Sequence, residues 1–174
     1  PTPITADQFR TIIQTKKFSN GSDSAVVAQL YEATLFGTLA QARALKYNEL
    51  GWGSEDLAQL AGVLLLNASR VSLLEIKRNP KIGDAGLIAL AACGSVGGMP
   101  SLKGLDLRLE FHRLLKGQGF GDAGLRALAD AINSGAWANL SKLQTRWKQE
   151  HSYTEAGRSI LAEACGLRGI KFEG

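Results

Sequence analysis

Apolar and polar residues alternate over five short stretches of the chain, with the period of two that is typical of a strand with one buried face. The inward-facing members of these stretches are Leu45/Tyr47, Leu74/Ile76, Leu105/Leu107, Leu143/Thr145 and Ile170/Phe172. The first members of successive pairs stand 29, 31, 38 and 27 residues apart. A strand that returns at a period of about 30 residues predicts a repeat architecture.

A glycine-containing phrase follows each of the first four stretches. Gly83-Asp84-Ala85-Gly86-Leu87 recurs at 121–125, and looser copies begin at Gly53 and Thr154. Each copy opens an Ala- and Leu-rich stretch with helical spacing. A unit of strand, turn and helix cannot bury its apolar face alone, whereas stacked units share one core between a parallel sheet and a layer of helices. The pattern therefore predicts an α/β solenoid over 43–174, with about four repeats and a final strand.

The first 42 residues lack this repeat and predict two helices. Thr5-x-x-Gln8 reads as a capping box for a helix that carries Phe9, Ile12 and Ile13. A second helix follows, with one apolar stripe made of Val27, Leu30, Tyr31 and Leu35. A solenoid needs its terminal repeats covered, so 1–42 is interpreted as an N-terminal helical cap.

The best copy of the repeat, LEIKRNPKIGDAGLIALA at 74–91, resembles the leucine-rich repeat family, in its ribonuclease-inhibitor-like subtype. The resemblance implies a curved parallel sheet on the concave side and helices on the convex side. It also implies that protein partners bind through the concave face. The turn asparagine of the family is present as Asn79, but Glu110 and Lys148 hold its place in the next two repeats. Neither replaces an amide that both donates and accepts, so those two turns are expected to be looser or rebuilt.

Two columns of polar residues are predicted on the concave face. The first is Lys46, Glu75, Asp106 and Gln144, and the second is Asn48, Lys77, Arg108 and Arg146. Parallel strands lie about 4.8 Å apart, so the cations of the second column need acidic neighbours, and Glu75 and Asp106 could pair with them diagonally. The face is either a solvated surface of mutually paired charges or a surface that binds a protein.

One repeat carries about seven extra residues before its helix begins, within the stretch FHRLLKGQ. Phe120 takes the core position of Ile82, which leaves Phe111, Leu114 and Leu115 as additional apolar residues at helical spacing. This segment either folds back over the neighbouring repeat or projects as an apolar and basic knob. A second irregular loop at 147–153 contains Trp147, and both loops are expected along one edge of the solenoid.

The remaining residues restrict the function further. Cys93 and Cys165 have no CxxC or Cys/His spacing, and they are interpreted as core residues of a protein from a reducing, intracellular compartment. That compartment is expected to be the cytoplasm, or an organelle entered after removal of a targeting segment.

His112 and His151 lie beside Glu110 and Glu150, which is weak evidence for a metal site. No apolar run has the length of a membrane span. Trp52 is expected in the core and Trp137 to be partly exposed.

The sequence has no nucleophile with a base, no paired acids and no phosphate-binding loop. It therefore favours a non-enzymatic module without cofactor or metal that binds a protein through the concave face and the loops at 109–120 and 147–153. The alternatives are an accessory structural subunit of a larger assembly and a binder of RNA or anionic surfaces. The residues expected to contact the partner are Glu75, Lys77, Asp106, Arg108 and Arg146 on the sheet, and Phe111, Leu114, Leu115 and Trp147 in the loops.

Overall fold

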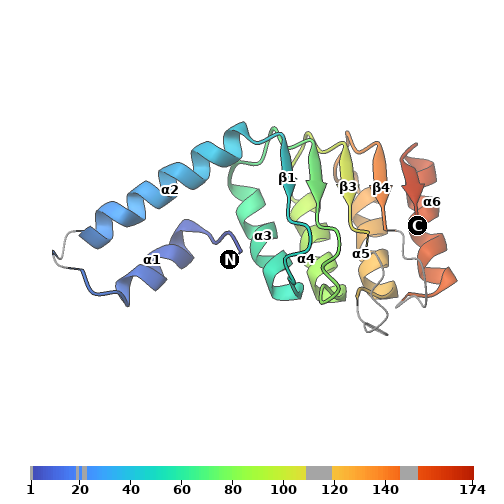
Figure 1. Cartoon of the computed structure of the whole chain (residues 1–174). Helices are drawn as coiled ribbons and strands as arrows, with labels where there is room; N and C mark the ends of the chain where they lie inside the picture. The colour runs from blue at the N-terminus through green and yellow to red at the C-terminus, as the bar shows by residue number, and fades with distance from the viewer. Residues whose placement is uncertain (1, 19, 21–22, 109–118, 146–152) are drawn as a thin grey trace.

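The computed structural model describes residues 2–18, 20, 23–108, 119–145 and 153–174. Within this part the chain forms an α/β fold with six helices and one parallel sheet (Figure 1). The helices are α1 (Ala6–Gln14), α2 (Asp23–Gln41), α3 (Ser54–Asn67), α4 (Asp84–Ser95), α5 (Asp122–Asn133) and α6 (Glu155–Leu167). The strands are β1 (Ala44–Lys46), β2 (Leu73–Glu75), β3 (Gly104–Asp106), β4 (Lys142–Gln144) and β5 (Lys171–Glu173).

The sheet follows chain order, β1-β2-β3-β4-β5, and every neighbouring pair of strands is parallel. Each of the first four strands is followed by a helix, and α3 to α6 form one layer behind the sheet (Figure 1). The alternation of strand and helix predicted from the sequence is therefore confirmed, and the arrangement is compatible with a solenoid. The helices begin where the sequence predicts, because Gly53, Gly83, Gly121 and Thr154 are their N-cap residues.

The last strand begins later than the sequence pattern predicts. Phe172 is the register partner of Leu143, so these inward-facing positions stand 29 residues apart and the predicted Ile170/Phe172 pair is wrong. Ile170 belongs to the turn that ends α6, where its N–H donates to the carbonyl of Cys165 over 2.8 Å. Ala136 makes the equivalent 2.9 Å bond to Ala131 in the preceding repeat. The alternating pattern therefore assigns Ile170 to the strand, although this apolar residue ends the helix before it.

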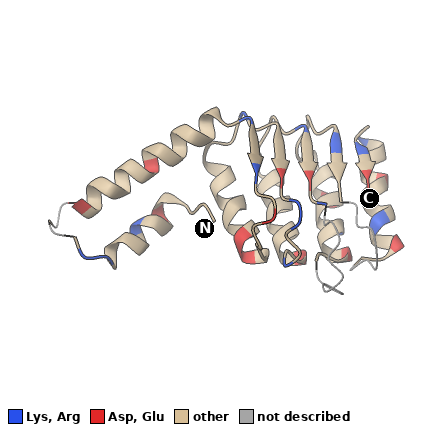
Figure 2. Cartoon of the chain, viewed as in Figure 1, with Lys and Arg blue, Asp and Glu red and all other residues tan. Residues whose placement is uncertain are grey.

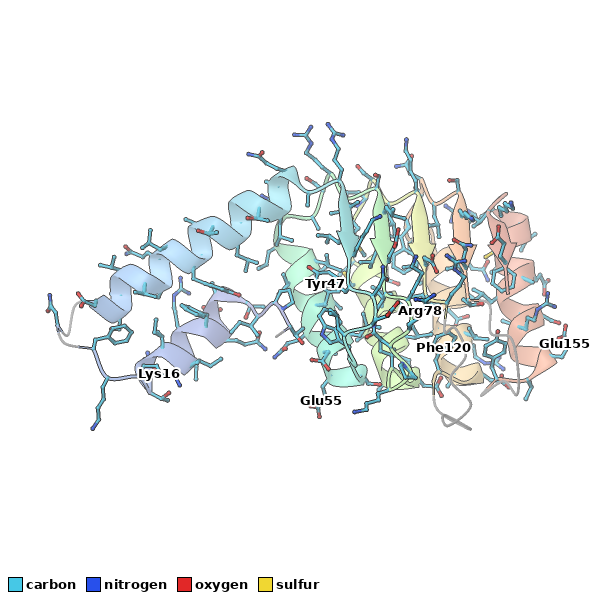
Figure 3. The ribbon with its side chains drawn as sticks, in the orientation of Figure 1. Lys16, Tyr47, Glu55, Arg78, Phe120 and Glu155 are labelled. Carbon is cyan, nitrogen blue, oxygen red and sulfur yellow. The ribbon has the colours of Figure 1, made fainter. Side chains whose placement is uncertain are left out.

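A continuous core fills the space between sheet and helices. Leu74, Leu105 and Leu143 are fully buried on the strands. Trp52, Ile82, Phe120 and Tyr153 are buried at equivalent places before or at the start of the four helices, as predicted for Trp52 and for Phe120, which is labelled in Figure 3. Trp137 is buried as well, so the expectation that it is partly exposed is wrong. Gly94 of α4 has no side chain, and the indole of Trp137 occupies the space where one would stand.

Both cysteines lie in this core, as the sequence predicts. Cys93 and Cys165 are free thiols with almost no exposed surface. Burial raises the pKa of each thiol to about 11, which keeps both protonated at neutral pH.

The first residue of each helix helps to cap the next helix in the stack. The Ser54 hydroxyl accepts from the Gly83 N–H over 2.9 Å. An oxygen of Asp84 accepts from the N–H groups of Gly121 and Gly124 over 2.6 and 2.8 Å. The carboxylate of Asp122 then accepts from the N–H and the hydroxyl of Thr154 over 2.6 and 2.7 Å. A glycine N-cap has no side chain of its own for this purpose, so the neighbouring repeat supplies the acceptor.

The second glycine of the repeated phrase allows the helices to approach closely. A Cβ atom at Gly86 would lie 3.1 Å from the Cα atom of Ser54. A Cβ atom at Gly124 would lie 2.8 Å from the capping oxygen of Asp84 and 3.1 Å from Leu87. Both the Asp and this Gly are therefore parts of one contact between successive helices.

Asn79 holds the first two repeats together at their loops. Its side chain is fully buried and donates to the carbonyls of Tyr47, Ile76 and Lys77 over 2.7, 3.1 and 3.3 Å. Its amide oxygen accepts from the N–H groups of Leu50 and Trp52 over 3.0 and 3.1 Å. The aligned residues Glu110 and Lys148 lie outside the described residues, so the rebuilding of their turns stays a prediction.

The predicted helices of the N-terminal segment are α1 and α2, which form a hairpin that projects from the first repeat (Figure 1). The predicted capping box of Thr5 and Gln8 is present. Phe9 of α1 stacks on Tyr31 of α2 with ring centroids 4.0 Å apart. The hairpin reaches the repeats through the Thr2 hydroxyl, which donates to the carboxylate of Asp56, and through Asn67, which donates to the Phe36 carbonyl. In the described part of the chain no helix could cross a bilayer.

Replacing Gly124 with Ala should lower the free energy of unfolding by about 1–3 kcal/mol, because the added Cβ displaces the capping carboxylate of Asp84. Gly62 of α3 is the matched control, since a Cβ there meets nothing within 4 Å. Gly62→Ala should raise stability by about 0.5–1 kcal/mol through helix propensity alone. Urea denaturation of both variants measures the difference. If both substitutions stabilised the protein equally, Gly124 would not lie in close contact with the Asp84 carboxylate.

Candidate functional site

Among the described elements no helix covers the outer face of the sheet, and the outward-pointing residues on this face form columns across the strands (Figure 1). Strand register aligns Lys46, Glu75, Asp106, Gln144 and Glu173 in one column. Asn48, Lys77 and Arg108 follow two residues later in the chain and form the next column. Figure 2 shows acidic residues at the ends of β2 and β3, with basic residues on β1 and in the loops that follow the strands. The columns predicted from the sequence are thus present as far as the described residues extend.

The charges of the first three repeats are linked in one zigzag, which we call the charge ladder: Lys46, Glu75, Lys77, Asp106 and Arg108. The Nζ atoms of Lys46 and Lys77 lie 3.4 and 3.1 Å from the two carboxylate oxygens of Glu75. Lys77 also lies 3.9 Å from Asp106 Oδ2. The predicted diagonal pairing is found only between Lys77 and Asp106, whereas Lys77 and Arg108 lie closer to the carboxylates of their own strands, Glu75 and Asp106.

Arg108 makes the tightest pair of the ladder. Its Nε and Nη2 atoms donate to the two oxygens of Asp106 over 2.9 and 2.8 Å, and its backbone N–H donates to Oδ1 over 3.2 Å. Only 7% of the Asp106 side chain is exposed, so the carboxylate depends on these donors in place of water. This forked geometry holds the two side chains together on the sheet.

Glu75 is the centre of the ladder. Asn48 Nδ2 donates to its Oε2 atom over 3.0 Å, while the Asn48 side-chain oxygen accepts from the Lys77 N–H over 2.9 Å. The hydrogen bond from Asn48 is the largest cause that lowers the pKa of Glu75, and Lys77 and Lys46 lower it further against the opposing effect of burial. Glu75 is therefore ionised at neutral pH, which suits an acceptor of hydrogen bonds and not a general acid.

A second charged cluster lies at the far end of the sheet. Glu173 Oε1 lies 3.4 Å from Lys142 and 3.2 Å from Lys171, and Gln144 donates to Oε2 over 2.5 Å. Hydrogen bonds from Lys171 and Gln144 lower the pKa of Glu173. Sequence reasoning missed this cluster because it placed β5 out of register. Aligning Phe172 with Leu143 would have placed Glu173 beside Gln144.

The structure brings four of the nine predicted contact residues together on the sheet: Glu75, Lys77, Asp106 and Arg108. Arg146, Phe111, Leu114, Leu115 and Trp147 lie outside the described residues, as do both histidines. Whether the insertion folds back or projects stays open for the same reason. Among the residues that the structure does describe, no group of three or more His, Cys, Asp or Glu side chains could hold a metal ion.

The charge ladder sets carboxylates and cations side by side over three adjacent strands. No protein-family model matches this chain, and no curated protein matches it.

Replacing Glu75 with Gln should change how stability depends on pH. The folded-state pKa of Glu75 lies below its ordinary value of 4.5, so its ionised form stabilises the fold above that value and the contribution disappears as pH falls through the folded-state pKa. At pH 7 the variant should be less stable by about 1–2 kcal/mol. Between pH 5 and 3 the two proteins should converge in melting temperature. Thermal unfolding across this range measures the convergence.

Glu163→Gln is the control for this comparison, because Glu163 is exposed on α6, away from the ladder. Asp56 and Asp122 also have lowered pKa values, so every variant should lose some stability in acid. A Glu75→Gln curve that runs parallel to the wild type at all pH values would show that the ladder does not stabilise the ionised carboxylate.

Proposed function

We propose that the chain is a leucine-rich repeat module of the ribonuclease-inhibitor-like subtype that binds a protein partner through the helix-free face of its sheet, without catalysis. The repeated strand, turn and helix support the assignment, as does the buried Asn79 that joins two successive loops. The loops at 109–120 and 147–153, with Phe111, Leu114, Leu115 and Trp147, belong to the proposed binding surface.

The observation that carries the proposal is the set of contacts within the charge ladder. Asp106 is buried and held by three hydrogen bonds from Arg108, and Glu75 receives donors from Asn48, Lys46 and Lys77. Binding by loose surface charges costs side-chain entropy, and these contacts reduce that cost for the two carboxylates and for Arg108. A preorganised set of charges on an open face is suited to recognition of one complementary surface.

The order of charges also indicates the kind of partner. Three cations alternate with two carboxylates along the ladder, so its net charge is only one positive unit. A partner surface with both signs, in the opposite order, fits this pattern better than a uniformly charged one. Lys46, with 60% of its side chain exposed, is the most accessible cation of the ladder.

This balance of charge disfavours the RNA or anionic-surface alternative at the ladder. Binding to a phosphate backbone relies on unpaired cations that displace counterions, and the lysines and arginine here already have carboxylate partners. The accessory-subunit alternative draws support from another part of the molecule. Large apolar side chains, among them Ile88 and Val96 of the helix layer, are exposed in the isolated chain.

Neutralising two ladder cations should weaken partner binding. Lys46→Gln with Lys77→Gln keeps hydrogen-bond donors at both sites, and it leaves Asp106 its bidentate partner Arg108. Crosslinking mass spectrometry in native extract identifies proteins captured by the wild type. Titration of a captured protein should then show a dissociation constant raised at least tenfold in the double variant, the loss of about 1.4 kcal/mol.

The control is Lys16→Gln with Arg126→Gln, which removes the same charge from exposed positions on the hairpin and on α5. Lys16, labelled in Figure 3, lies far from the sheet. Deletion of 111–117 tests the loop separately. If both double variants bind every captured protein as tightly as the wild type does, the sheet face is not the binding surface. A dissociation constant that rises with salt as steeply as nucleic-acid binding does would favour the anionic-surface alternative.

A further inference from the structure

One face of α2 is apolar and exposed over most of its length. Tyr31, Glu32 and Ala28 face α1, since Tyr31 stacks on Phe9, Glu32 pairs with Arg10 and Ala28 is buried. At 100° per residue, the opposite side of the helix carries Val26, Leu30, Ala33, Gly37 and Ala40, of which only Ala40 is partly buried. We call these five residues the α2 seam. The predicted stripe that joined Leu30 with Tyr31 is therefore wrong, because Leu30 is 62% exposed. In Figure 1 this helix forms the outer edge of the molecule, away from the repeats along most of its length.

The spacing within the α2 seam is that of a helix pair. Its members are separated by 4, 3, 4 and 3 residues, which is the 3.5-residue period of two helices that pack along a shared seam. Val26 and Leu30 are 52% and 62% exposed, and Ala33 and Gly37 are exposed as well. None of the five carries a charge. A seam of this kind is costly to leave in water and is suited to a second helix with an equally uncharged face.

Gly37 is unexplained by the contacts of the chain itself. It lies in the interior of a 19-residue helix, where glycine is less favourable than alanine. A Cβ atom at this position would meet nothing within 4 Å, so no described neighbour requires the glycine. Gly86 and Gly124, by contrast, face an adjoining helix closely. An open glycine on the α2 seam fits the close approach of a helix from outside.

We propose that the α2 seam binds the α2 seam of a second copy of the chain, antiparallel, about a twofold axis at Ala33. In that arrangement Val26 of one copy faces Ala40 of the other, Leu30 faces Gly37, and Ala33 faces Ala33. The large residues gather toward the start of the helix and the small ones toward its end, so antiparallel pairing sets each large side chain against a small one. A parallel pair would place Leu30 on Leu30 and leave a gap between the two Gly37 residues.

The charges that flank the seam support the same orientation. Asp23 begins α2 and the exposed Arg43 follows its end. Antiparallel pairing brings the end of α2 that carries Asp23 in each copy to the end that Arg43 follows in the other. The helix dipoles also oppose one another favourably in this orientation. Two copies related by a twofold axis use the same surface, so the contact closes as a dimer.

The dimer should be of moderate strength. A 19-residue helix is about 28 Å long, and three of the five seam positions are Ala or Gly. Such a contact lies toward the lower end of specific interfaces in size. We therefore expect a concentration-dependent equilibrium on the micromolar scale, visible by sedimentation velocity of the whole chain between about 1 and 300 µM.

Two substitutions separate dimerisation from folding. Gly37→Leu should raise the melting temperature at low concentration, because it removes a glycine from a helix, yet weaken the dimer at least tenfold by filling the space that Leu30 of the other copy occupies. Ala25→Leu is the control, since Ala25 is exposed on another side of α2 and should leave the dimer unchanged. Lys46→Gln with Lys77→Gln should not alter it either, because the charge ladder lies on the sheet.

Disulfide trapping tests the orientation. Ala33→Cys should crosslink to a second copy under mild oxidation, whereas Ala25→Cys should not. The native thiols of Cys93 and Cys165 are buried and do not compete. A mixture of Val26→Cys and Ala40→Cys proteins should crosslink to each other, while Val26→Cys alone should not.

The proposal would be overturned if sedimentation showed a single monomeric species at all concentrations and Ala33→Cys formed no crosslink. The α2 seam would then bind a different protein or none. Self-crosslinking of Val26→Cys would overturn the antiparallel orientation. A Gly37→Leu protein that is both stabler and equally dimeric would show that the helices do not meet at the seam.

Discussion

The stack of repeats depends on one contact, in which the first residue of a helix caps the N-terminus of the next. Asp84 bonds two N–H groups of α5, and Asp122 bonds Thr154 at the start of α6. The capping carboxylate of Asp84 occupies the space where a side chain at Gly124 would stand. The phrase Gly-Asp-Ala-Gly-Leu therefore recurs for two reasons. Its Asp caps the helix of the following repeat, and its second Gly leaves room for the capping residue of the preceding repeat. The same atoms therefore set the distance between successive helices and cap their N-termini.

This reciprocity explains which features could be predicted from the sequence. The phrase fixes where helices begin, and all four starts agree with it. The predictions are wrong near helix ends, where the sequence signal is weaker. The left-handed Gly169 precedes Ile170, which closes α6 through its bond to Cys165, and the alternation of apolar residues outweighed this glycine in the prediction. Trp137 is buried because Gly94, a whole repeat earlier, makes room for its ring, and that contact joins residues whose sequence gives no sign that they are neighbours.

The charge ladder illustrates the same limit within the candidate site. Strand spacing alone predicts that Glu75 and Asp106 pair diagonally with cations, but only Lys77 and Asp106 do so, at 3.9 Å, and the closest pairs lie along one strand. It does not predict how the pairs differ, since Asp106 is buried in a forked bond to Arg108 while Glu75 is shared among Asn48 and two lysines. The register of β5 also hid the cluster around Glu173. The period of the sequence predicts which residues share a column on the sheet. The burial of each of these residues depends on the side chains of its neighbours.

The two proposed surfaces lie on different elements and differ in chemistry. The sheet face is polar and its charges are paired, so it loses little by remaining in water until a complementary partner arrives. The α2 seam is uncharged and gains by being covered. A dimer formed through α2 leaves both sheet faces open. Two linked faces bind a partner with repeated sites more tightly than one does, because the second contact forms at high effective concentration. If both surfaces bind as proposed, the hairpin that projects from the repeats would pair two recognition surfaces, in addition to its predicted role as a cap.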